Sequence, residues 1–85
     1  MKREKFGYDQ EQCYEYYRTC KYQSGDRVAR KTDPTRHGTI QCRMANCYTG
    51  KPSHAGITWD DGDMEQVALK WLKHTGEARR VLPEV

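Results

Sequence analysis

Residues 57–67 read Ile-Thr-Trp-Asp-Asp-Gly-Asp-Met-Glu-Gln-Val, and this pattern predicts a tight β-hairpin. Apolar residues alternate along the first arm, and Asp-Gly is a strong signal for a short turn between two strands. A second strand–turn–strand pattern lies upstream at residues 25–40, which read Gly-Asp-Arg-Val-Ala-Arg-Lys-Thr-Asp-Pro-Thr-Arg-His-Gly-Thr-Ile. Two hairpins this close together leave no room for a crossover helix, so the chain is predicted to be mainly β and antiparallel.

The upstream hairpin contains its own turn signals. Pro34 fixes its own φ angle and Asp33 can accept hydrogen bonds from the backbone beyond it, so residues 33–36 are predicted to form the turn. Gly38 is expected to adopt a left-handed or bulged conformation. A loop is predicted over residues 45–53, where Asn, Gly and Pro interrupt the pattern.

Five strands are predicted in all, and a single helical turn at residues 69–72 separates the last two. The predicted strands are residues 27–31, 39–44, 55–60, 64–68 and 79–82. The side chains expected to face the core are Val28, Ile57 and Trp59.

A helix is predicted near the N-terminus, over residues 8–21. Four residues of this segment recur at helical spacing and form one apolar face: Cys13, Tyr16, Tyr17 and Cys20. That face is expected to lie on the β region and extend its core, and Ser24-Gly25 ends the helix. The chain is therefore expected to consist of a Tyr-rich helix in residues 1–23 and a β domain in residues 24–85.

Three of these motifs together resemble an SH3-like small β-barrel of the Tudor/KOW type, including those appended to bacterial helicase-like ATPases. They are Gly-Asp-Arg-Val at 25–28, Lys-Thr-Asp-Pro-Thr-Arg-His-Gly-Thr-Ile at 31–40, and Ile-Thr-Trp-Asp-Asp-Gly at 57–62. The resemblance implies a five-stranded antiparallel barrel with one N-terminal α-helix. It also implies a binding module, because members of this group bind nucleic acid, proteins or methylated peptides.

A more distant similarity is to the type II dihydrofolate reductases, which are short barrels that share the Gly-Asp-Arg-Val start. Their pore is lined by a Val-Gln-Ile-Tyr strand, whereas this chain has Glu65-Gln66-Val67-Ala68 in the nearest place. Only the glutamine is matched in type, and the Ile-Tyr pair is missing. Reductase activity is therefore not expected.

Size and hydropathy narrow the class of protein. A chain of 85 residues corresponds to one domain. No apolar run approaches the roughly 18 residues that a membrane span requires. The charged start Met1-Lys2-Arg3-Glu4-Lys5 is not followed by the apolar stretch of a signal peptide. The protein is therefore expected to be soluble and cytoplasmic, with no membrane partner.

Charge is distributed unevenly along a chain whose formal net charge is +3. Residues 25–56 contain six Lys/Arg and two Asp/Glu, whereas residues 57–72 contain one and four. The first hairpin is therefore basic and the second acidic. Such a polarised domain can steer a polyanion to one side, and the alternative is that the charges only solvate the outer faces of the strands.

The leading functional hypothesis is nucleic-acid binding through the basic hairpin and the loop at residues 45–54. Lysine and arginine side chains would contact phosphates, and a tyrosine would stack on a base. The candidate phosphate contacts are Arg27, Arg30, Lys31, Arg36, Arg43 and Lys51, and the candidate stacking residue is Tyr48.

The alternative hypothesis is a protein–protein interaction module. Tyrosine is favoured at interaction hot spots, and Tyr14, Tyr17 and Tyr22 are the candidate partner-binding residues. The partner would be a protein complex in which the chain is an accessory subunit, or a second copy of the chain. In a further variant, the chain is a small phage or mobile-element protein that binds and inhibits a host complex.

Catalysis and metal binding have less support. The histidines are scattered over predicted turns, so no catalytic residue and no cofactor are predicted, and the protein is not expected to be an enzyme. Cys42 and Cys47 are separated by four residues, a loose approximation to a zinc knuckle. A mixed site with His54 or His37 stays open as an alternative to small apolar cysteines, but no metal site is predicted.

Overall fold

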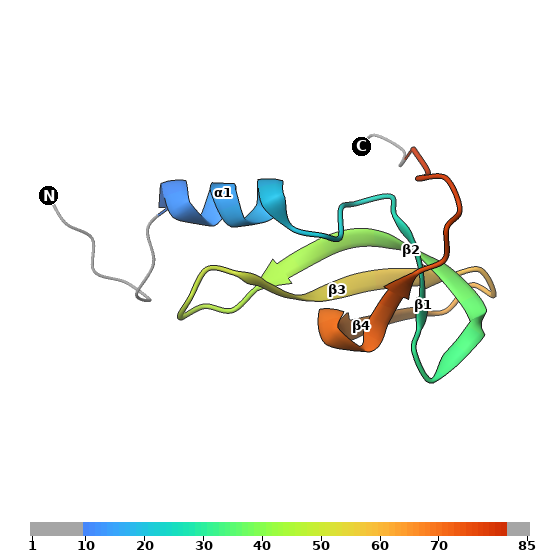
Figure 1. The fold of residues 1–85 in the computed structure, drawn as a ribbon. Coiled ribbons are helices and arrows are strands. Elements are labelled where there is room, and N and C mark those ends of the chain that lie inside the picture. The colour runs from blue at the N-terminus through green and yellow to red at the C-terminus, as the bar shows by residue number, and fades with distance from the viewer. Residues whose placement is uncertain (1–9, 82–85) are drawn as a thin grey trace, which may run out of the picture.

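The computed structural model of the chain describes residues 10–81 and shows one short helix followed by one antiparallel sheet (Figure 1). The helix is α1 (Gln10–Thr19). The strands are β1 (Arg27–Arg30), β2 (Asp33–Ala45), β3 (Pro52–Trp59), β4 (Met64–Ala68) and β5 (Leu72–His74), and the 3₁₀ turn η1 (Leu69–Trp71) lies between the last two. The strand order is β4-β3-β2-β1-β5, and every neighbouring pair is antiparallel. The prediction of a mainly β chain with one N-terminal helix is therefore confirmed.

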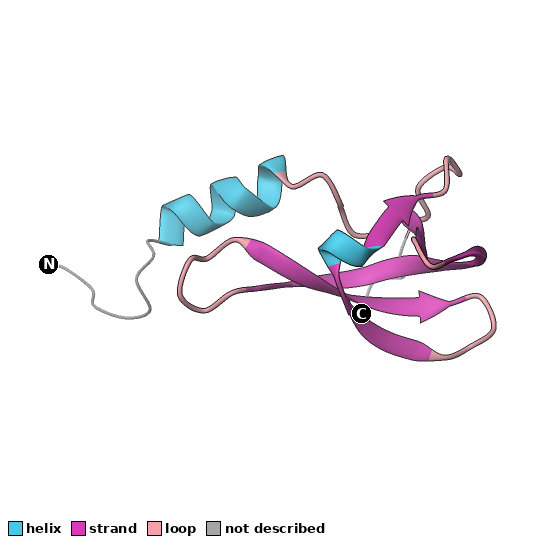
Figure 2. Ribbon diagram, turned by 60° about the horizontal axis from the view of Figure 1, so that its bottom comes forward, coloured by secondary structure: helices cyan, strands magenta, loops and turns pink. Residues whose placement is uncertain are grey.

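The sheet is bent around its central strand. β2 has 13 residues, and it pairs with β1 over Asp33–Thr39 and with β3 over Gly38–Ala45. The register shifts in both ladders, and such irregularities increase the local twist. Figure 2 shows the strands crossing one another at an angle. In the described residues β4 and β5 are the two ends of the sheet and do not pair, so the ladder does not close.

The core lies against one face of the sheet. Along β3, buried and partly buried residues alternate, which places Ala55, Ile57 and Trp59 inside as the sequence predicts for the last two. Residues from five other segments complete the cluster: Tyr22, Val28, Ile40, Val67 and Leu72. The hairpin predicted at Asp-Asp-Gly is also confirmed, with Gly62 at φ +101°.

The turn predicted at residues 33–36 is wrong. Arg30 pairs with Asp33, so the turn consists of Lys31 and Thr32, and β2 has already begun at Asp33. In the ladder, residues 34–36 lie between paired residues and have no counterpart on β1. Pro34 lacks a backbone N–H, and it is tolerated here because the bulge requires no ladder hydrogen bond from it.

The last strand is also placed differently from the prediction. It is β5 at Leu72–His74, not residues 79–82; residues 79–81 have no regular secondary structure, and Leu82 lies outside the described residues. Leu72 is buried in the core and pairs with Arg30. Three residues directly after a helical turn are too short to produce a periodic signal.

Gly38 is extended, not left-handed or bulged as predicted. Gly38 is not among the glycines that have a positive φ angle in the described residues. Its lack of a side chain instead permits close packing between β2 and β3. A Cβ at this position would lie 2.7 Å from Ile57 Cγ2 and 2.7 Å from Trp59 Cε3.

We expect Gly38→Ala to lower the free energy of unfolding by roughly 1–3 kcal/mol, because the added methyl group overpacks the core. Urea unfolding followed by circular dichroism measures the loss. Gly62→Asn is the matched control, since nothing lies within 4 Å of a Cβ there and asparagine tolerates positive φ. A loss no larger than that of the control would contradict the packing explanation.

Candidate nucleic-acid interface

Arg27, a candidate phosphate contact, is buried and fully engaged inside the molecule. Its side chain is 2% exposed, and its guanidinium donates to both carboxylate oxygens of Asp60 at 2.8 and 2.5 Å. It also donates to Thr39 Oγ1 at 2.8 Å and to Glu77 Oε1 at 3.2 Å. The hydrogen bond with Asp60 is the main cause that raises the pKa of Arg27 and lowers the pKa of Asp60. Arg27 is therefore a structural residue.

Arg36 pairs with the acidic hairpin. Its guanidinium lies 4.8 Å from the ring centroid of Trp59. It donates to Asp61 at 2.7 and 3.1 Å and to Asp63 at 3.1 Å. The hydrogen bond from Arg36 is the main cause that lowers the pKa of Asp61. The charge of Arg36 is thus neutralised within the molecule, although part of its side chain reaches solvent.

Arg30, on β1, is likewise paired with an acidic residue of the second hairpin. Its guanidinium forms an ion pair with Glu65, whose other carboxylate oxygen accepts a hydrogen bond from Trp59 Nε1 at 2.9 Å. The basic first hairpin and the acidic second hairpin therefore lie side by side and pair with each other. The uneven charge along the sequence is largely internal charge complementarity.

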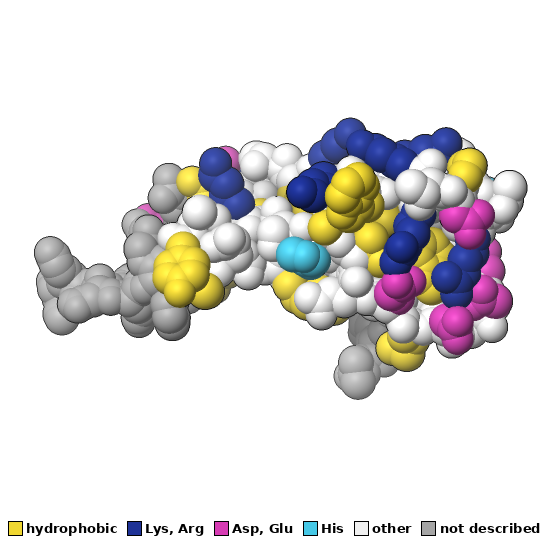
Figure 3. All heavy atoms as spheres, turned by 90° about the horizontal axis from the view of Figure 1, so that it is seen from below, with side chains coloured by type: hydrophobic (Ala, Val, Ile, Leu, Met, Phe, Trp, Pro, Cys, Tyr) yellow, Lys and Arg dark blue, Asp and Glu magenta, His cyan; other side chains and the backbone are white. Residues whose placement is uncertain are grey.

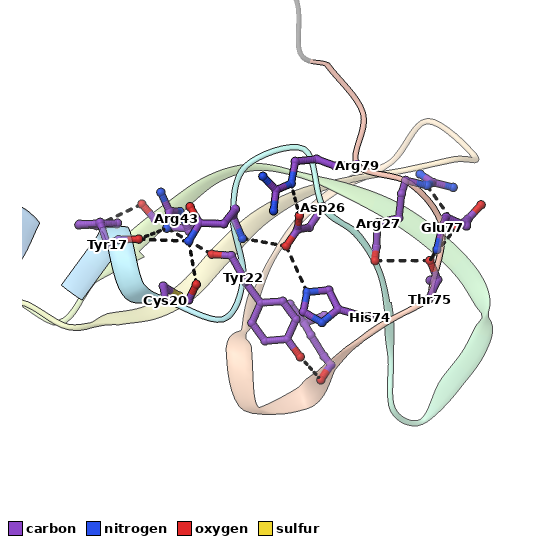
Figure 4. Close-up of polar contacts among 12 residues, drawn as sticks. Tyr17, Cys20, Tyr22, Asp26, Arg27, Arg43, His74, Thr75, Glu77 and Arg79 are labelled. Carbon is purple, nitrogen blue, oxygen red and sulfur yellow. Dashed lines mark hydrogen bonds and ion pairs between the residues drawn. The ribbon is translucent and has the colours of Figure 1, made fainter. Parts of the chain in front are cut away.

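Arg43 joins α1 to the sheet. Its Nη1 donates to the carbonyl oxygens of Tyr17 at 2.8 Å and Tyr22 at 3.2 Å, and the guanidinium lies 4.9 Å from the Tyr17 ring centroid. In return, the Tyr17 hydroxyl donates to the Arg43 carbonyl at 3.3 Å (Figure 4). The structure thus brings Tyr17 and Arg43 together in a contact that holds the helix.

Two of the three candidate partner-binding tyrosines have structural contacts. Tyr17 bonds Arg43 as described, and Tyr22 is buried, donates to the Leu72 carbonyl at 2.8 Å and stacks on His74 with ring centroids 4.4 Å apart. Tyr14 is 65% exposed on α1. The Tyr16 ring lies 5.3 Å from Lys51 Nζ, and the side chain of Cys13 lies outside the described residues.

The loop predicted at residues 45–53 spans residues 46–51 between β2 and β3. Asn46 Oδ1 accepts hydrogen bonds from the backbone of Tyr48 at 2.7 Å and Thr49 at 3.3 Å, which shapes the turn. Tyr48 is 72% exposed and Lys51 is exposed. Both lie at the end of the β2–β3 ribbon nearest α1, away from β5 (Figures 1 and 2).

A second basic surface forms where η1 and β5 meet the turn of the first hairpin. The Lys31 N–H donates to the Trp71 carbonyl at 2.8 Å, and Lys73 pairs with Ala29 across the ladder. Lys70 Nζ lies 5.3 Å from the Trp71 ring centroid, and Trp71 is 53% exposed. Lys31, Lys70, Trp71 and Lys73 are called the lysine–tryptophan patch below.

The burial of Leu69 and Leu72 determines which of their neighbours in the chain face solvent. Leu72 is buried in the core and Leu69 packs against it, so Lys70, Trp71 and Lys73 are left on the solvent side. These three residues were not predicted from sequence, because residues 69–72 were assigned only to a helical turn and Lys73 to no element. The available signal was Leu69-Lys70-Trp71-Leu72-Lys73, in which two leucines spaced by three leave the basic and aromatic residues outside.

The lysines of the patch are not neutralised by acidic side chains, a property that they share in the described residues with exposed Lys21 and Lys51. Within residues 10–81, Lys31, Lys70 and Lys73 form no ion pair with an acidic side chain. Figure 3 shows basic side chains beside exposed hydrophobic ones on one face, with the acidic side chains gathered at the end where the β3–β4 hairpin lies. Such a surface offers a polyanion both phosphate contacts and a flat ring.

Other candidate chemistry is not assembled. Among the described residues, no group of three or more His, Cys, Asp or Glu side chains is placed to hold a metal ion. Cys42 and Cys47 are free and exposed. Cys42 lines an apolar hollow of about 360 Å³ on the outer face of the sheet, together with Met44, Gly56 and Met64. Between residues 10 and 81, no helix combines the length and the apolar character needed to cross a membrane.

Comparison with known proteins finds no matching family model, no matching curated relative and no matching solved structure.

β5, which carries part of the patch, is anchored by the carboxylate of Asp26 (Figure 4). Asp26 is buried and accepts hydrogen bonds from the Gln23 backbone at 2.9 Å, His74 Nε2 at 3.1 Å and Arg79 Nε at 2.7 Å. Burial raises the pKa of Asp26, but these hydrogen bonds outweigh it and hold the pKa below its ordinary value. The ionised carboxylate therefore stabilises the native state.

We expect Asp26→Asn to cost roughly 1–3 kcal/mol of stability at neutral pH, because an amide nitrogen replaces one acceptor in a buried site. The depressed pKa means that the wild-type carboxylate stabilises the fold above about pH 4, the unfolded-state value, and that this contribution is lost as the pH falls through the folded-state pKa. Urea unfolding at pH 7 and near pH 2.5 measures both effects. A gap between wild type and variant that is equally large at both pH values would contradict this assignment.

Proposed function

We propose that the chain is a non-catalytic binding module that contacts nucleic acid through the lysine–tryptophan patch. The observation that carries the proposal is the contrast between the two kinds of cation. Arg27, Arg30 and Arg36 are paired with acidic side chains, whereas the three lysines of the patch have no acidic partner in the described residues. When unpaired lysines on one surface contact phosphates, the counterions condensed on the nucleic acid are released. This release drives nucleic-acid binding.

We further propose that the bent sheet is an SH3-like small barrel. β1 lies between β2 and β5, so that the first strand is brought next to the last. β2 is shared between two ladders that face a common core. An experimental structure with a flat, open sheet would contradict this part of the proposal.

The proposed surface differs from the basic hairpin expected from sequence. Lys31 is common to both, and Lys70, Trp71 and Lys73 replace the arginines as the residues that meet the ligand. Three lysines predict a modest dependence on salt, with log K falling against log salt concentration at a slope of about −2 to −3. Affinity should therefore be measured at low ionic strength first.

We expect the double substitution Lys31→Gln and Lys73→Gln to weaken binding of a labelled oligonucleotide roughly tenfold or more, because two phosphate contacts are lost. The salt slope should become shallower by about 1.4–1.8. Fluorescence anisotropy at about 50 and 200 mM salt measures both quantities.

The matched control is Lys21→Gln with Lys51→Gln, which removes the same charge from exposed positions outside the patch. The control should keep most of the affinity. Equal losses for the two double variants would show that net charge, not the patch, governs binding, and would refute the proposed surface.

A further inference from the structure

The patch contains an aromatic ring that the core does not use. The chain has two tryptophans, of which Trp59 is 1% exposed and Trp71 is 53% exposed. The backbone of Trp71 is held by the Lys31 N–H at its carbonyl and by Leu72, which is buried next to it. The ring is therefore an exposed flat surface on an anchored backbone, with the Lys70 amine beside it.

The neighbouring Lys70 does not prevent a ligand from reaching this ring. Its Nζ lies 5.3 Å from the Trp71 ring centroid, and both side chains are exposed. An exposed lysine–ring contact is weaker than a nucleobase stacked on an aromatic side chain. A base can therefore take the place of the Lys70 amine on the ring, and the amine is then available to a phosphate of the same strand.

The surrounding charge selects the class of ligand. The Lys70 amine at the ring, together with Lys31 and Lys73 of the same patch, repels a cationic ligand such as a methylated lysine, so the patch is unlike an aromatic cage for cations. In a duplex, the base faces are already stacked on one another. A single strand presents both unstacked bases and phosphates, and matches an exposed ring flanked by lysines.

We propose that the ligand of the lysine–tryptophan patch is single-stranded nucleic acid, with one base stacked on Trp71 and the adjoining phosphates held by Lys31, Lys70 and Lys73. This inference rests on the proposed function and narrows it to one class of nucleic acid. DNA and RNA share the chemistry that it uses.

The test is a titration of intrinsic tryptophan fluorescence and anisotropy at low salt with four probes: oligo-dT, oligo-U, a DNA duplex of the same length, and poly-glutamate. Both single strands are expected to quench the tryptophan fluorescence. Each should bind at least about tenfold more tightly than the duplex. Binding of either strand supports the inference, and the tighter one identifies the preferred sugar.

The decisive variant is Trp71→Leu, which should lower single-strand affinity roughly five- to a hundredfold and abolish the quenching, while the salt slope changes little. Trp71→Phe keeps a ring and should recover part of the affinity. Thermal unfolding by circular dichroism checks that both variants fold, as expected for an exposed side chain.

Two results would overturn the inference in distinguishable ways. Equal affinity for duplex and single strand, unchanged in Trp71→Leu, would remove the stacking claim and leave the proposed nucleic-acid function standing. Binding of poly-glutamate as tight as that of oligo-dT, or no binding of any nucleic acid at low salt, would overturn the proposed function as well.

Discussion

The buried guanidinium of Arg27 is the constraint on which the rest of the structure depends. A charge removed from water costs on the order of several kcal/mol unless partners surround it. Here the partners come from three other segments: Asp60 in the β3–β4 hairpin, Thr39 on β2 and Glu77 beyond β5. Those segments must therefore converge on β1. The backbone follows the same course, since Thr75 donates to the Arg27 carbonyl at 3.1 Å.

The same constraint explains where function can reside. Arginine presents several donors in a rigid fork, which suits it to internal pairing with carboxylates and carbonyls, whereas the lysine ammonium is strongly hydrated and stays in solvent. In this chain Arg27, Arg30, Arg36 and Arg43 each bind acidic groups or backbone carbonyls within the molecule. Among the cations without an acidic partner in residues 10–81, Lys31, Lys70 and Lys73 belong to the lysine–tryptophan patch.

Local signals were sufficient for part of the fold. The Asp-Asp-Gly hairpin, the inward Ile57 and Trp59, β4 and the helical turn after it all follow from neighbouring residues, and each is present. Features that depend on distant contacts were not accessible. Gly38 is extended because Ile57 and Trp59 pack against it, and β5 is a strand because Leu72 enters the core opposite Arg30.

In the candidate site, too, some features follow from neighbouring residues and others depend on distant contacts. A count of charges along the chain identifies a basic and an acidic hairpin, but it cannot show that Arg36 and Asp61 pair with each other. Lys31 was predicted from sequence as a phosphate contact, although it was assigned to the end of a strand and lies in the turn. Lys70, Trp71 and Lys73 become a site only when β5 pairs with β1, and Tyr22 appears as a buried core residue only in the same context.

In this structure the arginines support the fold, and we propose that the lysine–tryptophan patch meets the ligand. The most direct measurement is a map of ¹H–¹⁵N chemical-shift changes during a low-salt titration with oligo-dT. We expect the largest changes on the amides of Lys31 and residues 70–73 and on the Trp71 indole, with the Trp59 indole little affected. Changes centred instead on Arg36 or on the loop at residues 46–51 would contradict it.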